Sequence, residues 1–406
     1  MSSESQYWQR NLYVCLFGSF TNITAMSLLL PFLPVYVEQL GVTGHAAIVQ
    51  WSGIAYGITF LGAGLMAPVW GRMADRYGRK LILMRACLAL AICMSLIGLA
   101  QNIWQLVGLR LLTGLLGGYA SGAVVLVATQ TPKERAAWAL GTLSTGAMAG
   151  TLLGPLVGGV LPGLMGVRQT FFLAGGVVFI AFLASVFFIR EDKSKIPGRL
   201  APGAASAWAT IPDRRPVVAM LATATLLMLA NMSIEPIITV YIGQLGQPGQ
   251  SSGDIVFTAG LVMAASAVGS ILAAPRLGRL ADRIGPWKVI VGCLTVCGVL
   301  LIPQAFVASS WQLLALRFLM GLSLAGLLPA IAATIRHNVP QGTGTILGYN
   351  TSAQYAGQVL GPLLGGFAGG HFGMRAVFIL TALIMFAGAG YNLMMQRRMA
   401  AQPSAG

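Results

Sequence analysis

The chain has 406 residues, of which 56% are hydrophobic and only 9% are charged. Soluble globular proteins carry about 25% charged residues, so this composition excludes an ordinary water-soluble fold. The net charge of +15 would suit a partner of nucleic acid, but the positions of the charges favour another explanation.

Apolar stretches recur from end to end, each long enough to cross a hydrocarbon core about 30 Å thick. The sequence therefore predicts an all-α membrane protein with twelve transmembrane helices. Their cores lie near 12–37, 49–70, 81–100, 105–127, 138–161, 169–189, 216–240, 255–275, 288–308, 312–335, 343–368 and 376–396.

The basic residues follow the positive-inside pattern of multi-pass membrane proteins. With a cytoplasmic N-terminus, all but four of the 25 Lys and Arg residues fall in or beside cytoplasmic segments. Arg168 and Arg375 lie outside, and Arg110 and Arg317 lie within spans. We therefore expect both termini to be cytoplasmic, and no nucleic-acid partner.

Many residues recur at a constant offset of 207, which indicates two homologous halves. Pro68, Gly71, Arg72, Asp75, Trp104, Arg110, Gly150 and Pro155 match Pro275, Gly278, Arg279, Asp282, Trp311, Arg317, Gly357 and Pro362. Six spans per half preserve orientation, so the sequence predicts two parallel six-helix repeats, a plan found among secondary transporters. The expected domains are bundles at 1–189 and 216–406, joined by a cytoplasmic linker at 190–215.

These features resemble the major facilitator superfamily over nearly the whole chain. Within it, the chain is most similar to the twelve-span drug:proton antiporters of the MdtG multidrug resistance type, through LPFLPVYVEQLGVTGH (30–45), GRMADRYGRK (71–80), LAQNIWQL (99–106) and WALGTLSTG (138–146). The resemblance implies the major facilitator fold and proton-driven multidrug efflux by alternating access. It also implies a monomer in the bacterial cytoplasmic (inner) membrane, with small-molecule substrates, protons as the coupling ion and no cofactor.

The segment Gly71–Lys80 and its second copy, Gly278–Trp287, are predicted to be cytoplasmic loops. In the proteins it resembles, this loop latches the cytoplasmic side shut; the alternative is that its charges only obey the positive-inside rule. Pro286 and Trp287 replace the basic pair of the first copy, so the second latch is expected to be weaker. The latch residues are Gly71, Asp75, Arg76, Gly78, Arg79, Asp282 and Arg283.

A second motif is a row of glycines in the fifth span, four residues apart and hence on one helix face. Such a face lets helix backbones pack closely. The resemblance further identifies it as the motif that marks exporters. Its residues are Gly146, Gly150, Gly154, Pro155, Gly158 and Gly159.

An antiporter needs a group that takes up and releases protons. Of the ten acids, only Glu235 lies within a predicted span, directly before Pro236. An intramembrane acid is a functional-site hypothesis by default. The alternative is a carboxylate that is hydrogen-bonded at a proline kink. Glu38 and then Asp75 are the reserve candidates.

Arg110 is also expected to take part in proton coupling, because the family motif places an arginine there; the alternative is an arginine that snorkels to the interface. Thr113 stands where that motif commonly has glutamine. The substrate cavity is predicted between the halves. Its candidates are Asn22, Thr24, Met26, Tyr56, Tyr119, Asn231, Met232, Asn350, Gln354 and Tyr355.

The sequence indicates no enzyme chemistry and no metal site, because it offers neither a nucleophile–base set nor a His/Cys cluster with ligand spacing. Two alternatives remain open. The first is a transporter of a sugar or organic-acid metabolite with the same fold, and the second is a membrane receptor or sensor.

Overall fold

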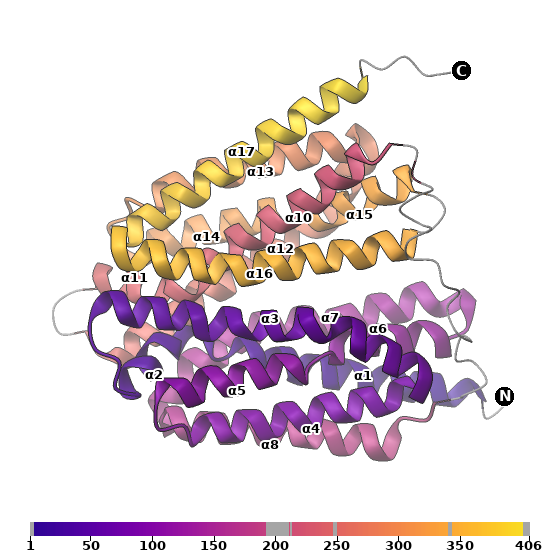
Figure 1. The fold of residues 1–406 in the computed structure, drawn as a ribbon, viewed down its shortest axis with the longest axis horizontal. Coiled ribbons are helices and arrows are strands. Elements are labelled where there is room, and N and C mark those ends of the chain that lie inside the picture. Colours follow the sequence, from indigo (N-terminus) through magenta and orange to yellow (C-terminus); the bar gives the residue numbers. More distant parts are fainter. Residues whose placement is uncertain (1–3, 192–210, 212, 247–249, 340–342, 401–406) are drawn as a thin grey trace. The chain divides into compact units, whose positions relative to one another are not determined.

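The computed structural model describes residues 4–191, 211, 213–246, 250–339 and 343–400, and all regular structure in these segments is helical (Figure 1). The first half contains α1 (Glu4–Ser27), η1 (Leu30–Phe32), α2 (Leu33–Gln39), α3 (His45–Tyr77), α4 (Arg79–Gly98), α5 (Ile103–Leu115), α6 (Tyr119–Gln130), η2 (Lys133–Arg135), α7 (Ala136–Met165) and α8 (Val167–Phe188). The second half contains α10 (Arg215–Ile234), η4 (Glu235–Ile237), α11 (Ile238–Leu245), α12 (Ser252–Ile284), α13 (Pro286–Gln304), α14 (Ser310–Leu324), α15 (Leu327–Asn338), α16 (Thr343–Phe372) and α17 (Met374–Ala400).

In the described part of the chain, eleven helical stretches are long and apolar enough to cross a membrane, which confirms the prediction of an all-α membrane protein. The remaining long helix is α16, whose 30 residues span about 45 Å at 1.5 Å per residue. It carries Asn350, Gln354 and Gln358 among many glycines, and these residues lower its apolar character.

The predicted spans 12–37, 105–127, 216–240 and 312–335 are found at these places, but the helix in each, the first and fourth span of each half, is broken rather than continuous. In the first spans, α1 and α10 each give way to a 3₁₀ turn with a proline at its start, Pro31 in η1 and Pro236 in η4. Proline has no backbone N–H for the helical ladder, so the helix breaks there. In the fourth span, α5 ends before Gly118, whose φ of 112° is readily reached only by glycine.

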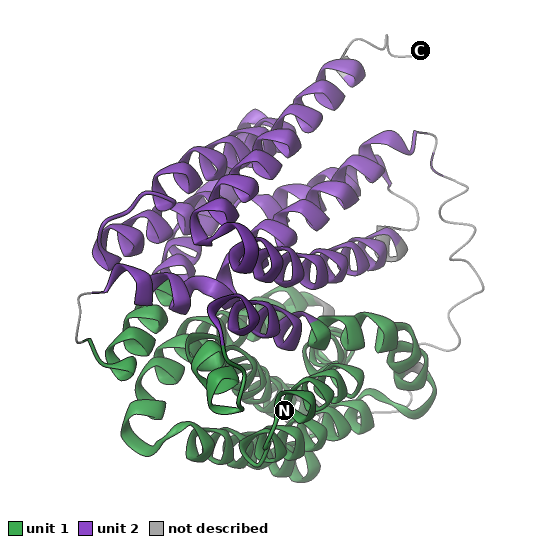
Figure 2. Cartoon of the chain, turned by 60° about the vertical axis from the view of Figure 1, so that its left-hand side comes forward, with its two compact units in different colours: residues 1–43, 58–201, 250–264 green, residues 44–57, 202–249, 265–406 purple. Residues whose placement is uncertain are grey.

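The chain divides into two compact units (Figure 2). Unit 1 comprises residues 1–43, 58–201 and 250–264, and unit 2 comprises residues 44–57, 202–249 and 265–406. Each unit is thus one sequence half with a helical segment from the other: the start of α12 belongs to unit 1 and the start of α3 to unit 2. Of the predicted linker, residues 192–210 and 212 lie outside the described residues.

The glycine row of α7 packs directly against α1 within unit 1. A Cβ added to Gly146 or Gly150 would lie 2.8 Å from the carbonyl oxygen of Leu16 or Phe20, and one added to Gly158 would collide with the Leu28 carbonyl. Only a helix face without side chains permits this approach. In unit 2, α16 meets α10 in the same way, through Gly357, Gly361 and Gly365.

The repeat is therefore visible in contacts as well as in sequence. The Tyr36 hydroxyl on α2 donates to the Ile97 carbonyl, and the Tyr241 hydroxyl on α11 donates to the Gln304 carbonyl at 2.8 Å. Each bond joins the short C-terminal piece of a broken first span to the end of the third span in the same half. These contacts place the two first spans at an offset of 205, two residues less than the rest of the repeat.

Candidate functional site

The acid predicted within a span, Glu235, opens η4 at the break in the first span of the second half. Its side chain is partly exposed. One turn earlier, at the end of α10, the Asn231 amide donates to Glu235 Oε1 over 3.3 Å. The proline break thus places a carboxylate where the helix ladder is interrupted, with an amide beside it.

Arg317, on α14, supplies a positive charge to the same site. It is only 1% exposed, and it interacts electrostatically with Glu235. Its Nη1 lies 3.8 Å from the sulfur of Met320, and its Nε has no hydrogen-bond partner among the described residues. A buried guanidinium with so few polar partners depends on a nearby anion. Protonation of Glu235 would remove that anion, so the charge balance of the site changes with a single proton.

The first half has the arginine of this arrangement but not the acid. Arg110, on α5, is completely buried and interacts electrostatically with Cys93 of α4. At the offset of 205, Leu30 takes the place of Glu235 and Pro31 that of Pro236. The two halves therefore share a buried arginine and a proline break. The acid directly before that proline, Glu235, is present in the second half and is replaced by Leu30 in the first.

The reserve acids lie elsewhere. Glu38, on α2 in unit 1, is exposed. The side chain of Asp75 is outside the described residues, although its backbone belongs to α3.

The segment Gly71–Lys80 is not the loop that its glycines suggested. Helix α3 continues to Tyr77, with Gly71 inside it, and α4 begins at Arg79. Gly78 alone makes the turn, with a φ of 96°. The second copy repeats this design, since α12 runs to Ile284 and Gly285 turns with a φ of 92°. The copies differ at the next position, where Pro286 starts α13 without a backbone N–H.

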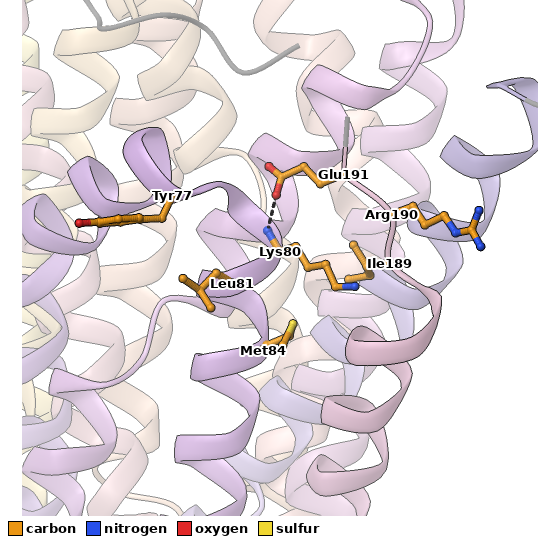
Figure 3. A pocket seen from close by; sticks show the side chains of 7 residues that line it. All are labelled: Tyr77, Lys80, Leu81, Met84, Ile189, Arg190 and Glu191. Carbon is orange, nitrogen blue, oxygen red and sulfur yellow. Dashed lines mark hydrogen bonds between the residues drawn. The ribbon is translucent and has the colours of Figure 1, made fainter. Parts of the chain in front are cut away.

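An acid that the sequence did not single out caps the first of these turns. The two carboxylate oxygens of Glu191 accept hydrogen bonds from the backbone N–H groups of Arg79 and Lys80, at 2.7 and 2.9 Å. Figure 3 shows the bond to Lys80. The Lys80 ammonium in turn donates to the Val186 carbonyl of α8 over 2.8 Å. A cavity of about 560 Å³ lies beside this cap, lined by residues that include Tyr77 and Met84. The cap joins two segments 112 residues apart, a distance that no local sequence pattern signals.

Arg85 is a second residue that the sequence does not single out, because the positive-inside pattern groups it with the basic residues of the cytoplasmic segments. It lies six residues inside α4, with its guanidinium 3.4 Å from the centroid of the Trp70 ring. Its Nη2 donates to the Gly117 carbonyl over 2.7 Å, and Trp70 Nε1 donates to the Leu115 carbonyl over 2.6 Å. Both carbonyls are at the break between α5 and α6, where the helix ladder stops. Arg85 and Trp70 supply hydrogen-bond donors to these carbonyls.

The ten residues predicted to line a substrate cavity differ in exposure. Four are buried, at 4–8% exposure, and the other six are partly exposed. The Asn22 amide donates to Gly18 O and Cys87 Sγ, and the Tyr119 ring packs against Gly18, so both side chains are engaged inside unit 1. The buried four are Asn22, Tyr56, Tyr119 and Asn350; the partly exposed six are Thr24, Met26, Asn231, Met232, Gln354 and Tyr355.

Twelve long helical spans in two repeats, with charged groups buried among them, define a multi-pass membrane transporter. The Major Facilitator Superfamily profile matches residues 15–258 and 249–405. The chain belongs to the major facilitator superfamily, a family of transporters and not of enzymes.

Relatives of high sequence identity point to a narrower group within this superfamily. The chain is 45% identical over 396 residues to the multidrug resistance protein MdtG of Salmonella paratyphi C, covering 97% of each chain. It is 42% identical over 386 residues to MdtG of Proteus mirabilis, covering 95% of each. Both matches confirm the expected kinship with MdtG-type proteins.

Solved structures share the fold at low sequence identity. A bacterial homolog of the human lysosomal transporter Spinster, in an inward-facing and occupied conformation, superimposes with a TM-score of 0.80 at 15% identity over 98% of this chain and 99% of that one. A mutant of the nucleoside transporter NupG gives 0.76 at 14% identity, over 94% and 99%. These matches confirm the major facilitator fold.

Proposed function

We propose that this protein is a secondary active exporter of drug-like small molecules, coupled to proton influx by alternating access. The observation that carries the proposal is the 42–45% identity, over nearly full length, to multidrug resistance proteins. The two six-helix halves, at 1–189 and 216–406, would rock about a substrate cavity lined by the partly exposed residues described above. The glycine motif of α7, which the resemblance identifies as the motif that marks exporters, supports the same function.

Glu235 is the proposed proton carrier, with Arg317 as its charge partner. In the deprotonated state the carboxylate balances the buried guanidinium, and in the protonated state it does not. The two states therefore differ in electrostatic energy, which is what a coupling group must provide. Arg110, Glu38 and Asp75 remain secondary candidates for the proton pathway.

The driving force is sufficient for this function. A membrane potential of 100 mV together with one pH unit supplies about 3.7 kcal/mol per proton. That free energy sustains a concentration gradient of roughly 500-fold for an exchange of one proton per substrate. Further parts of the proposal are a monomer in the bacterial cytoplasmic membrane, both termini in the cytoplasm, and a cytoplasmic latch at Gly71–Lys80 and its second copy.

The decisive experiment uses purified protein in liposomes that enclose a pH probe, with a panel of antibiotics and dyes as substrates. We expect substrate-dependent proton movement in the wild type and its loss in Glu235→Gln. Asp254→Asn is the matched control, since Asp254 is an exposed acid at the start of α12. If Glu38→Gln abolishes coupling and Glu235→Gln does not, the carrier is Glu38. Proton movement with one sugar or organic acid, and with no drug, would make the protein a metabolite transporter.

A further inference from the structure

Two arginines from distant parts of the chain meet at one aromatic ring in unit 1. The guanidinium carbons of Arg10 and Arg190 lie 5.2 and 5.0 Å from the centroid of the Tyr7 ring. Arg190 Nη1 also donates to the Tyr7 hydroxyl over 3.0 Å. The backbone of Arg190 is held to α1 by two bonds with the Asn11 amide, at 2.7 and 3.0 Å. Two cations are thus fixed beside the beginning of α1.

No acid among the described residues neutralises this pair. Glu191, the next residue after Arg190, directs its carboxylate to the N-terminus of α4, and Arg190 points away from it (Figure 3). Within the described part of the chain, Nε and Nη2 of Arg10 are buried and have no hydrogen-bond acceptor. Arg10 is half-buried, and buried guanidinium nitrogens without an acceptor are costly, whereas Arg190 is exposed beside it, so the site is suited to receive an anion that contacts both.

An apolar groove begins at Arg10 and follows one face of α1. It has a volume of about 490 Å³ and is lined by Gln9, Arg10, Tyr13, Val14 and Phe17 of α1 and Ala184 of α8. Tyr13 is 58% exposed and Phe17 is 36% exposed. From Arg10 to Phe17 the helix rises about 10 Å, so the charged end and the apolar wall lie at different depths. A ligand that fits must carry an anion at one end and hydrocarbon along its length.

We propose that this groove binds one anionic phospholipid, with its phosphate near Arg10 and Arg190 and an acyl chain along Tyr13 and Phe17. The groove belongs to a transmembrane span, and its open side carries exposed aromatic residues, as a lipid-facing surface does. Basic pockets between transmembrane helices at the membrane surface bind anionic headgroups, and the guanidinium fork matches phosphate oxygens. Free phosphate would leave the aromatic wall unused, and a zwitterionic lipid would leave the two charges unbalanced.

The test is native mass spectrometry of the full chain in detergent micelles, titrated with phosphatidylglycerol or with phosphatidylcholine of the same acyl chains. We expect the wild type to retain one phosphatidylglycerol at least about tenfold more tightly than phosphatidylcholine, because two basic residues act on the anionic headgroup. Arg10→Gln and Arg190→Gln should each weaken phosphatidylglycerol binding about fivefold, since a basic residue near an anionic headgroup contributes about 1 kcal/mol. Arg10→Lys keeps the charge and should keep most of the preference.

The matched control is Arg336→Gln, which removes an exposed arginine at the end of α15. Equal retention of the two lipids by the wild type would overturn the proposal without any variant. If Arg336→Gln weakened phosphatidylglycerol binding as much as Arg10→Gln does, the preference would come from the overall positive charge and not from this groove, which would contradict the proposal. Displacement of phosphatidylglycerol by millimolar inorganic phosphate would show a simple anion site in place of a lipid site.

Discussion

Single residues decide how the second and third spans are joined. Gly78 makes the whole turn between α3 and α4, and Glu191 satisfies two N–H groups that the start of α4 would otherwise leave without partners. The glycine turn and its carboxylate cap lie against each other, because a Cβ added to Gly78 would lie 2.6 Å from Glu191 Oε2. Replacement of either residue should therefore weaken the same joint.

Glu191→Gln removes the charge of this cap and one of its two acceptors while keeping the side chain's length. We expect a loss of about 1 kcal/mol in stability, since a helix cap contributes about 0.5–2 kcal/mol and an anion at a helix N-terminus about 0.3–1 kcal/mol. The measurement is the thermal unfolding midpoint in detergent. Glu134→Gln is the control, because Glu134 is an exposed acid outside this joint. Equal midpoints for the two variants would mean that the cap adds no stability.

The two glycines of the motif GRMADRYGRK should respond in opposite ways to alanine. Gly78→Ala forces a side chain into a positive φ and against Glu191, so the midpoint should fall. Gly71 lies inside α3 with nothing within 4 Å of an added Cβ, so Gly71→Ala should be neutral or should stabilise the helix by up to about 1 kcal/mol. A similar fall in both variants would contradict the single-residue turn.

At the scale of elements, the glycine row of α7 determines how closely the first and fifth spans approach. Gly158→Ala would push a methyl group into the Leu28 carbonyl, and overpacking of this kind costs about 1–3 kcal/mol. Gly141, in the same helix, has open space around it, so Gly141→Ala is the matched control. We expect the unfolding midpoint and the transport rate to fall in Gly158→Ala only. If both variants behave as wild type, the backbones are not in the tight contact described.

Some of these features could be predicted from the sequence, and others could not. Span number, repeat and family follow from hydropathy and from residues such as Arg110 and Pro155 that recur in register. The kink at Pro236 could be anticipated from the proline, whereas the break at Gly118 lies within an uninterrupted apolar stretch, where the sequence does not distinguish it. The partners of Arg190 and Glu191 depend on contacts between segments far apart in the chain, and no local pattern encodes those. The rarity of charge within a span is enough to single out Glu235, whereas its electrostatic interaction with Arg317 depends on the fold.

At the scale of the whole molecule, the two halves share one architecture but differ in chemistry. Both have a broken first span, a buried arginine and a glycine row. Among the described residues, the second half alone has an acid at the break, Glu235, and the first half alone has a carboxylate cap, Glu191, on its third span. At the offset of 207, the position of Glu191 is taken by Arg398. We propose that the two halves perform different tasks, proton coupling in the second half and the stronger latch in the first.

This division of tasks predicts unequal effects of two equivalent substitutions, Asp75→Asn and Asp282→Asn. Asp75 is followed by the cations Arg79 and Lys80, whereas Pro286 and Trp287 follow Asp282, and Pro286 offers no N–H to an anion. Loss of one carboxylate from a segment rich in cations is worth up to about 1 kcal/mol, or roughly a fivefold change in rate. We expect Asp75→Asn to slow transport by about that factor, with substrate affinity at equilibrium unchanged, and Asp282→Asn to have a smaller effect. Transport rates in liposomes and equilibrium binding in detergent, measured on the same preparations, separate cycling from recognition. Equal slowing in the two variants would assign the latch to both halves alike, and a loss of affinity in Asp75→Asn would assign that residue to substrate binding instead.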